Sequence, residues 1–185
     1  FTQVEKHLKS LLERYKDRKC KVYLLHGDLS PGQMTSLYSN PKISALINIS
    51  HGEGFGLPMY EAAREGLPVI TCGWSGQLDI LQHNGKDYFT SVEYTVRPVQ
   101  QQAHWKGVIE PDAMWAFADQ GSYKMSLRYA SKNLDKLNQQ ALELKEIVND
   151  KFSDEKLFKI FCDSIYEPDP ELEEWLKKLE EMDDL

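Results

Sequence analysis

Short apolar runs that alternate with helical segments limit the fold of this chain more than any other feature. The apolar runs are residues 22–25, 43–49 and 67–72. Helical patterns lie around them, over about residues 4–16, 31–40, 58–65 and 77–81. Nearly continuous apolar strands that alternate with helices are typical of a parallel sheet covered on both faces. The sequence therefore predicts an α/β fold.

The second half of the chain has a different pattern. Trp105, Trp115 and Phe117 fall in a region predicted as loop and helix, before a long polar helix over about residues 122–148. A further helix begins near Ser153. The predicted organisation is an α/β core over 1–100, a helical C-terminal part of the same domain over 101–167, and an acidic tail helix over 168–185.

The tail is predicted to be amphipathic. Its apolar stripe consists of Leu172, Trp175, Leu176, Leu179 and Met182. Such a stripe needs a surface to cover it, and we expect it to pack on its own domain. Docking to a partner is the alternative.

Composition excludes several classes of protein. The 185 residues are 41% hydrophobic, enough for a core, and the net charge of −7 argues against a general affinity for nucleic acid or anionic membrane. A local basic patch stays compatible with that charge. The chain has no apolar run of the roughly 20 residues that span a bilayer.

The cysteines indicate the cellular compartment of the chain, and the first residue indicates whether the chain is part of a longer protein. Cys20, Cys72 and Cys162 lie far apart and form no CxxC pattern, which argues against a disulfide framework and a zinc site. We expect reduced thiols in a cytoplasmic protein, with neither a metal nor another cofactor. Because the chain starts at Phe1, we expect it to be a piece of a longer protein.

The stretch "HGEGFGLPMYE", residues 51–61, is the main candidate for a binding loop. It follows the predicted strand 43–49 and leads into a helix that starts near Pro58. Ligands of open parallel sheets bind beyond the carboxyl ends of the strands, and the free N–H groups of a helix start suit a phosphate. Glycines at 52, 54 and 56 allow close approach of the backbone. This pattern indicates a cradle for a diphosphate.

Two common phosphate motifs do not fit this loop. The dinucleotide fingerprint would need glycine where Leu57 or Met59 stands, and the Walker lysine is absent. The carboxylates of Glu53 and Glu61 suit sugar hydroxyls instead, because a carboxylate accepts two hydrogen bonds from a vicinal diol. Two acids beside one phosphate loop indicate a nucleotide sugar as the ligand.

The order of these segments resembles a known family. "GEGFGLPMYEAAREGLPVI", with the Glu53-x7-Glu61 spacing, is preceded by "LSPGQMTSLYSNPKISALINIS" and followed by "TCGWSGQLDIL". Together they resemble the C-terminal, donor-binding domain of the retaining family-four glycosyltransferases of GT-B fold, closely over about residues 21–82. The resemblance implies a Rossmann-like sheet with additional C-terminal helices, in which residues 1–100 are the nucleotide-sugar-binding core.

The resemblance also implies a role for each loop residue. Glu53 is the expected catalytic residue, in contact with the donor sugar near its anomeric carbon, and Glu61 is expected to hold the ribose hydroxyls. The remaining implied contacts are the sugar and phosphate site at Gly52, Gly54, Phe55, Gly56 and Leu57, and the border of the base at Leu25, His26 and Gly27. Sugar transfer with retention would pass through an oxocarbenium-like transition state.

Other residues near the loop are weaker candidates. His51 and His26 fit hydrogen-bonded structural histidines better than ligands. Trp74, Ser75 and Gly76 fit either a border of the sugar pocket or a tight turn, while Arg64 is expected to face solvent.

The chain departs from the family in two ways. It lacks an Arg and Lys pair for the diphosphate, and it lacks the N-terminal Rossmann domain that binds the acceptor. That domain is expected in the parent chain or in a partner, and the acceptor is unknown. Three hypotheses stay open: the donor-binding part of a transferase, a non-catalytic module that binds nucleotide sugar or a partner, and an α/β scaffold whose loop resembles a binding loop by accident.

Overall fold

The computed structural model describes residues 2–165, 170–171 and 174–175. The chain divides into two compact units, residues 1–37 and residues 38–185. Within the described ranges, every helix is too short or too polar to span a lipid bilayer.

The first unit contains one helix and all but the last residue of a second, joined by irregular chain, and that last residue, Tyr38, belongs to the second unit. Helix α1 (Thr2–Glu13) contains no buried residue and carries a Glu5–Lys9 ion pair of 2.7 Å. Helix α2 (Pro31–Tyr38) starts with a reciprocal cap, in which the Ser30 hydroxyl accepts from the Gln33 amide at 3.3 Å and Gln33 Oε1 accepts from the Ser30 amide at 2.8 Å. The expected helices at 4–16 and 31–40 are therefore present, each with slightly different bounds.

The strand expected over residues 22–25 does not form. The backbone is irregular there, and no described strand pairs with it. The side chains are open to solvent, with Tyr23 82% and Leu25 65% exposed. A short apolar run becomes a strand only when a neighbour supplies its ladder, so this prediction was wrong for the structure described.

The second unit is built around a small parallel sheet with the order β1-β2-β5. Its strands are β1 (Leu46–Asn48), β2 (Val69–Cys72) and β5 (Thr90–Val92). The register places Ile70 of the central strand between Ile47 and Thr90. The strands expected at 43–49 and 67–72 are thus confirmed in shortened form, whereas β5 was not anticipated.

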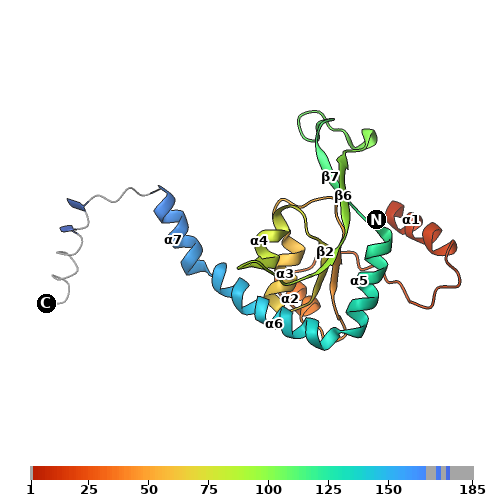
Figure 1. Cartoon of the computed structure of the whole chain (residues 1–185), viewed down its shortest axis with the longest axis horizontal. Helices are drawn as coiled ribbons and strands as arrows, with labels where there is room; N and C mark the ends of the chain where they lie inside the picture. The colour runs from red at the N-terminus through yellow and green to blue at the C-terminus, as the bar shows by residue number, and fades with distance from the viewer. Residues whose placement is uncertain (1, 166–169, 172–173, 176–185) are drawn as a thin grey trace. The chain divides into compact units, whose positions relative to one another are not determined.

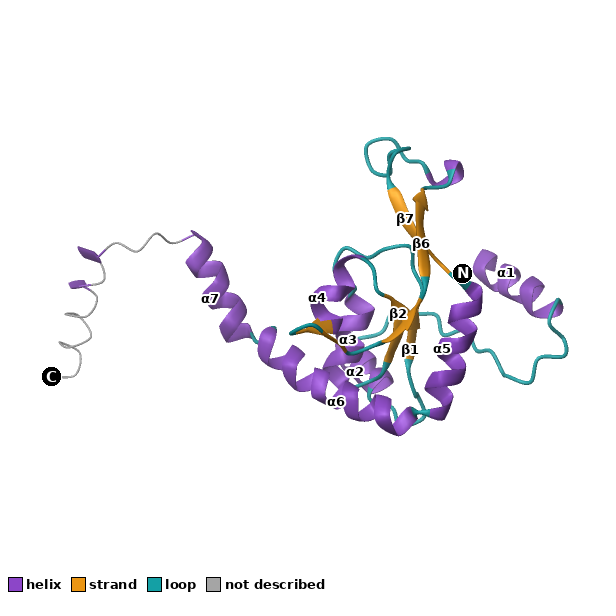
Figure 2. Ribbon diagram, viewed as in Figure 1, coloured by secondary structure: helices purple, strands orange, loops and turns teal. Residues whose placement is uncertain are grey.

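Helices lie on both faces of this sheet. Val69 packs in one cluster with α3 (Leu57–Glu65), α4 (Leu78–Leu81) and α6 (Leu134–Lys151). Its neighbour Ile70 packs in a second cluster with residues of α5 (Gln120–Lys132). Because successive strand residues point to opposite faces, the two clusters are the two sides of the sheet. Helices α3 and α5 are seen beside its strands in Figure 2.

Helix α3 has the boundaries that its capping residues dictate. Pro58 occupies the first turn, and Gly66 ends the helix in the left-handed conformation at φ 75°. A 3-10 turn (Ser75–Gln77) then leads into α4, close to the helix expected at 77–81.

Antiparallel strands replace the loop and helix expected around Trp115. Strand β6 (Tyr94–Pro98) pairs with β7 (Met114–Ala118), and the two form a long arm in Figure 1. A smaller pair joins β3 (Gln82–His83) to β4 (Lys86–Asp87). A second 3-10 turn (Gln101–Ala103) lies beyond β6. Trp115 and Phe117 are strand residues, so the helix prediction was wrong there.

The long polar helix expected over 122–148 is two helices, α5 and α6. The break lies at Asn133, whose side-chain amide donates to the Tyr129 carbonyl at 2.7 Å and so ends α5. Helix α7 (Asp154–Ile165) follows and has no buried residue. The predicted tail helix 168–185 lies outside the described residues except for 170–171 and 174–175, which are helical.

Candidate functional site

The carboxylate of Glu53 is oriented by the end of strand β1. Asn48 Nδ2 donates to Glu53 Oε1 at 3.0 Å, and the Ser50 hydroxyl donates to the same oxygen at 2.9 Å. Among the described residues, none donates to Oε2 or forms an ion pair with Glu53. One oxygen is therefore held by the protein, while the other is available to a ligand.

The backbone of Glu53 is held by the turn that follows β2. The Ser75 hydroxyl donates to the Glu53 carbonyl at 2.7 Å and accepts from the Glu53 amide at 3.3 Å, and the Gly76 amide donates to the same carbonyl at 3.1 Å. A Cβ at Gly76 would overlap the Gly54 carbonyl. Ser75 and Gly76 therefore fix the loop, a role that their sequence pattern alone did not distinguish from a border of the sugar pocket.

The loop presents several backbone amides at the start of α3. The carbonyl of Gly56 accepts from the Met59 and Tyr60 amides at 2.9 and 3.0 Å, which closes the first helical turn. Within the described part of the chain, the amides of residues 54–57 donate no hydrogen bond to protein. Free amides at the positive end of a helix dipole favour a bound anion.

An aromatic cluster supports the loop from the side. The Phe55 ring lies 5.4 Å from the Tyr60 ring and 5.7 Å from the Phe152 ring, edge to face with the latter. Phe152 lies at the C-terminal end of α6. The ring contacts connect the binding loop to a helix distant in sequence, so sequence spacing alone did not reveal them.

The second acid, Glu61, is paired with a tyrosine. The Tyr38 hydroxyl donates a hydrogen bond to the Glu61 carboxylate. The pKa of Tyr38 is raised to about 12, mainly because the phenol is partly buried and secondly because the negative charge of Glu61 lies beside it. Both side chains are half-buried. A carboxylate accepts several hydrogen bonds, so the tyrosine orients Glu61 and leaves acceptor positions for hydroxyl groups of a ligand.

His51 is a structural residue in this fold, as expected. Its Nδ1 lies 2.7 Å from the Ala116 carbonyl, and its ring stacks on Trp115 with centroids 4.8 Å apart. The Ala116 amide also donates to the His51 carbonyl at 3.1 Å. These contacts attach the start of the loop to strand β7.

The remaining candidates take different places. Arg64 is exposed and lies over the Tyr60 ring at 5.6 Å, as expected for a solvent-facing residue. Leu25, His26 and Gly27, predicted to border the base, lie in exposed irregular chain of the first unit. No group of acidic, histidine or cysteine side chains in the described ranges has the arrangement of a metal site.

In comparisons with protein-family models, with curated proteins and with solved structures, nothing matches this chain. The loop and the first turns of α3 combine free amides at a helix start with two half-buried carboxylates, each oriented by a neighbour. That arrangement can bind a phosphate-bearing ligand through amides and accept hydrogen bonds from hydroxyl groups.

Proposed function

We propose that this chain is the donor-binding part of a retaining glycosyltransferase that uses a nucleoside-diphosphate sugar. The observation that carries the proposal is the pairing of the free amides of residues 54–57 with the oriented carboxylate of Glu53. The amides suit a diphosphate, and the carboxylate suits a sugar beside it. The resemblance of the Glu53-x7-Glu61 stretch to family-four enzymes supports the same assignment.

In this proposal each acid serves one end of the ligand. Glu53 Oε2 meets the donor sugar near its anomeric carbon, where a negative charge stabilises an oxocarbenium-like transition state. Glu61, oriented by Tyr38, accepts hydrogen bonds from the ribose hydroxyls. The amides and the dipole of α3 stabilise the charge that develops on the departing diphosphate.

A non-catalytic module that binds a nucleotide sugar is the second candidate. One observation favours it: Arg64, the basic residue nearest to the loop in sequence, is exposed and lies over the Tyr60 ring. The diphosphate charge would then be met by amides and the helix dipole without a side-chain cation. Such a site binds its ligand but stabilises the leaving group less.

Calorimetric titration with uridine, guanosine and adenosine diphosphates tests the ribose assignment. We expect one of the three to bind, and Glu61→Ala to weaken it about 10- to 100-fold, because hydrogen bonds to a charged group contribute roughly 1.5–3 kcal/mol. Glu65→Ala, at the other end of the same helix, is the matched control and should leave the affinity unchanged. Equal affinity in the wild type and Glu61→Ala would contradict the assignment of Glu61 to the ribose hydroxyls.

The roles of the two acids can be distinguished by measuring the affinity for both the nucleoside diphosphate and the nucleotide sugar. Glu53→Gln should lower the affinity for the nucleotide sugar and leave the affinity for the free nucleoside diphosphate unchanged, because only the sugar is expected to reach Glu53. Glu61→Ala should weaken both ligands by a similar factor. If Glu53→Gln lowers the affinity for both ligands while its thermal stability is unchanged, the assignment of Glu53 to the sugar is contradicted.

A further inference from the structure

Charge is distributed unevenly between the two units. Residues 1–37 contain seven Lys and Arg against four Asp and Glu, whereas residues 38–185 contain fifteen against twenty-five. The first unit therefore carries a net charge of +3 and the second a net charge of −10. The chain therefore contains a basic N-terminal unit although its overall net charge is negative.

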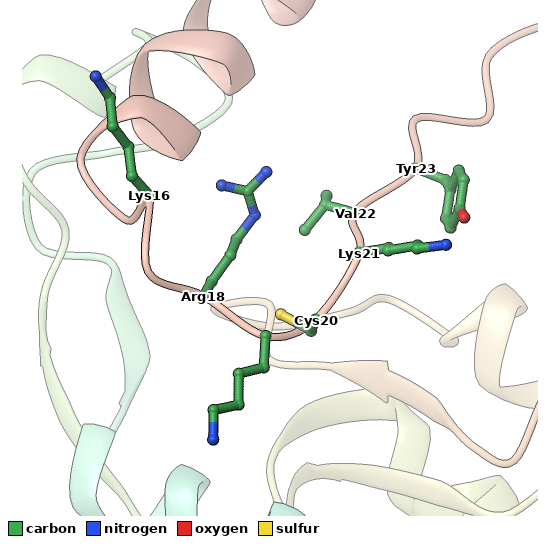
Figure 3. A pocket seen from close by; sticks show the side chains of 7 residues that line it. Lys16, Arg18, Cys20, Lys21, Val22 and Tyr23 are labelled. Carbon is green, nitrogen blue, oxygen red and sulfur yellow. The ribbon is translucent and has the colours of Figure 1, made fainter.

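Most of this positive charge lies in one bend after α1, residues 14–21, called the basic bend below. Its cations are Arg14, Lys16, Arg18, Lys19 and Lys21. Four of them, with Tyr23, line an open hollow of about 410 Å³. In Figure 3, Lys16, Arg18 and Lys21 spread along the chain and do not converge on one point. The spacing suits a surface with many anionic groups better than a single small anion.

Arg18 also stiffens the bend. Its guanidinium donates to the Leu12 and Tyr15 carbonyls, both at 3.1 Å, and so caps the C-terminal end of α1. An arginine has five donors, so others stay available for a phosphate. The bend is thereby attached to the helix that precedes it.

Apolar side chains lie on both sides of the basic bend in sequence. Helix α1 has an apolar stripe that consists of Val4, Leu8, Leu11 and Leu12, and it has no buried residue. After the bend, the run Val22–Leu25 is exposed over its whole length. Polar side chains such as Lys6 and Lys9 cover the opposite face of α1. On the stripe of α1, Val4 and Leu11 are exposed while Leu8 and Leu12 are half-buried. The first unit thus combines a partly exposed apolar helix face with a cluster of cations.

We propose that the first unit binds peripherally to an anionic lipid surface. The apolar stripe of α1 enters the boundary between headgroups and acyl chains, and the basic bend contacts lipid phosphates and carboxylates. The aliphatic stripe of α1 favours lipid over nucleic acid, because bases and phosphates offer no apolar layer for it to enter. The exposed ring of Tyr23 suits a membrane interface as well as a base. Binding is reversible and sensitive to salt, since exposed charges supply much of the affinity.

Vesicle co-sedimentation tests this proposal. We expect the chain to bind vesicles that contain about 30 mol% phosphatidylserine, to bind phosphatidylcholine vesicles weakly, and to be released as salt rises from about 0.1 to 0.5 M. Replacement of Lys16, Arg18, Lys19 and Lys21 by Gln should lower the affinity by almost three orders of magnitude, since each cation near the surface contributes roughly a factor of five. The double variant Val4→Gln, Leu11→Gln should also lower the affinity for vesicles, although it retains all the cations.

A matched variant controls for net charge. Lys124, Arg128, Lys132 and Lys136 are exposed on α5 and α6, and their replacement by Gln removes the same charge from the second unit. This variant should bind vesicles at least as well as the wild type, and circular dichroism should show that all variants remain folded. Equal binding to both vesicle types would overturn the proposal. So would an equal loss in the control, or binding to single-stranded DNA without binding to vesicles.

Discussion

The two acids of the candidate site are oriented by neutral side chains. Asn48 and Ser50 hold Glu53, and Tyr38 holds Glu61. Neutral donors orient a carboxylate while leaving its full negative charge, whereas an ion pair with Lys or Arg would compensate that charge. Carboxylates of this kind suit hydroxyl ligands and a transition state with positive charge.

The pairing of Tyr38 with Glu61 should be visible in alkaline titration. Because the folded pKa is raised from 10.0 to about 12, the unfolded chain loses the phenol proton first. The free energy of unfolding should therefore fall as the pH rises from about 10 to 12, by about 1–2 kcal/mol after allowance for solvent screening. Tyr38→Phe should remove this component of the decline.

Phenolate absorbance at rising pH measures the effect directly. We expect Tyr38→Phe to lose one phenol that titrates near pH 12, and Glu61→Gln to move that phenol toward lower pH while burial keeps it raised. Identical late titration in the wild type and Tyr38→Phe would contradict the assignment.

At the residue scale, the roles of the two acids stay predictions, and the residues that orient them were not predicted. Both acids were identified from their spacing around the glycines, and Asn48 and Ser50 lie within five residues of Glu53. Tyr38 and Ser75 lie more than twenty residues from the acids that they hold, and only the tertiary structure reveals these contacts. Local sequence therefore singled out the acids as candidates but not the residues that position them.

At the scale of elements, the loop between β1 and α3 contains one glycine that the fold requires, Gly56, and one with open surroundings, Gly54. Gly56 has φ 92°, and a Cβ there would lie 3.0 Å from side-chain atoms of Gln77 and Met59. A Cβ added at Gly54 would instead have no described atom within 4 Å outside its own chain neighbours. The free amide and open surroundings of Gly54 leave room for a ligand.

Two alanine substitutions test this distinction. Gly56→Ala should lower the free energy of unfolding by about 1–3 kcal/mol, because the left-handed backbone is strained for alanine. Gly54→Ala should leave stability within about 0.5 kcal/mol of the wild type and weaken nucleoside diphosphate binding. Chemical denaturation and calorimetry measure the two quantities. Loss of stability in Gly54→Ala, or none in Gly56→Ala, would contradict this distinction between the glycines.

Element boundaries were predictable where a single residue dictates them. Pro58 and Gly66 set the limits of α3. Asn133 was not recognised in the sequence as a break, but the structure shows that it ends α5 and so divides one expected helix into two. Strands β5 and β6 also had a signal, since residues 90–96 are rich in Thr, Val and Tyr. The run 22–25 has similar composition but no ladder partner among the described strands. Strand formation depends on a partner that composition does not supply.

At the scale of the whole molecule, the α/β class was predictable and the sheet order was not. Apolar runs between helices predicted parallel strands, and β2 confirms this with Val69 and Ile70 in the clusters on opposite faces. The antiparallel arm β6–β7 and the division at residues 37 and 38 depend on long-range contacts. Periodicity reports local burial, whereas topology requires knowledge of which segments meet.

The central claim is that the amides at the start of α3 bind the diphosphate of a nucleotide sugar. Two-dimensional amide NMR of the whole chain, titrated with uridine, guanosine and adenosine diphosphates, tests it most directly. We predict that one nucleotide shifts the amide signals of residues 54–57 more than any others in the chain, and that inorganic sulfate at equal ionic strength shifts them less. If none of the three nucleotides moves these signals, or if the largest shifts lie elsewhere, the proposed donor site is wrong.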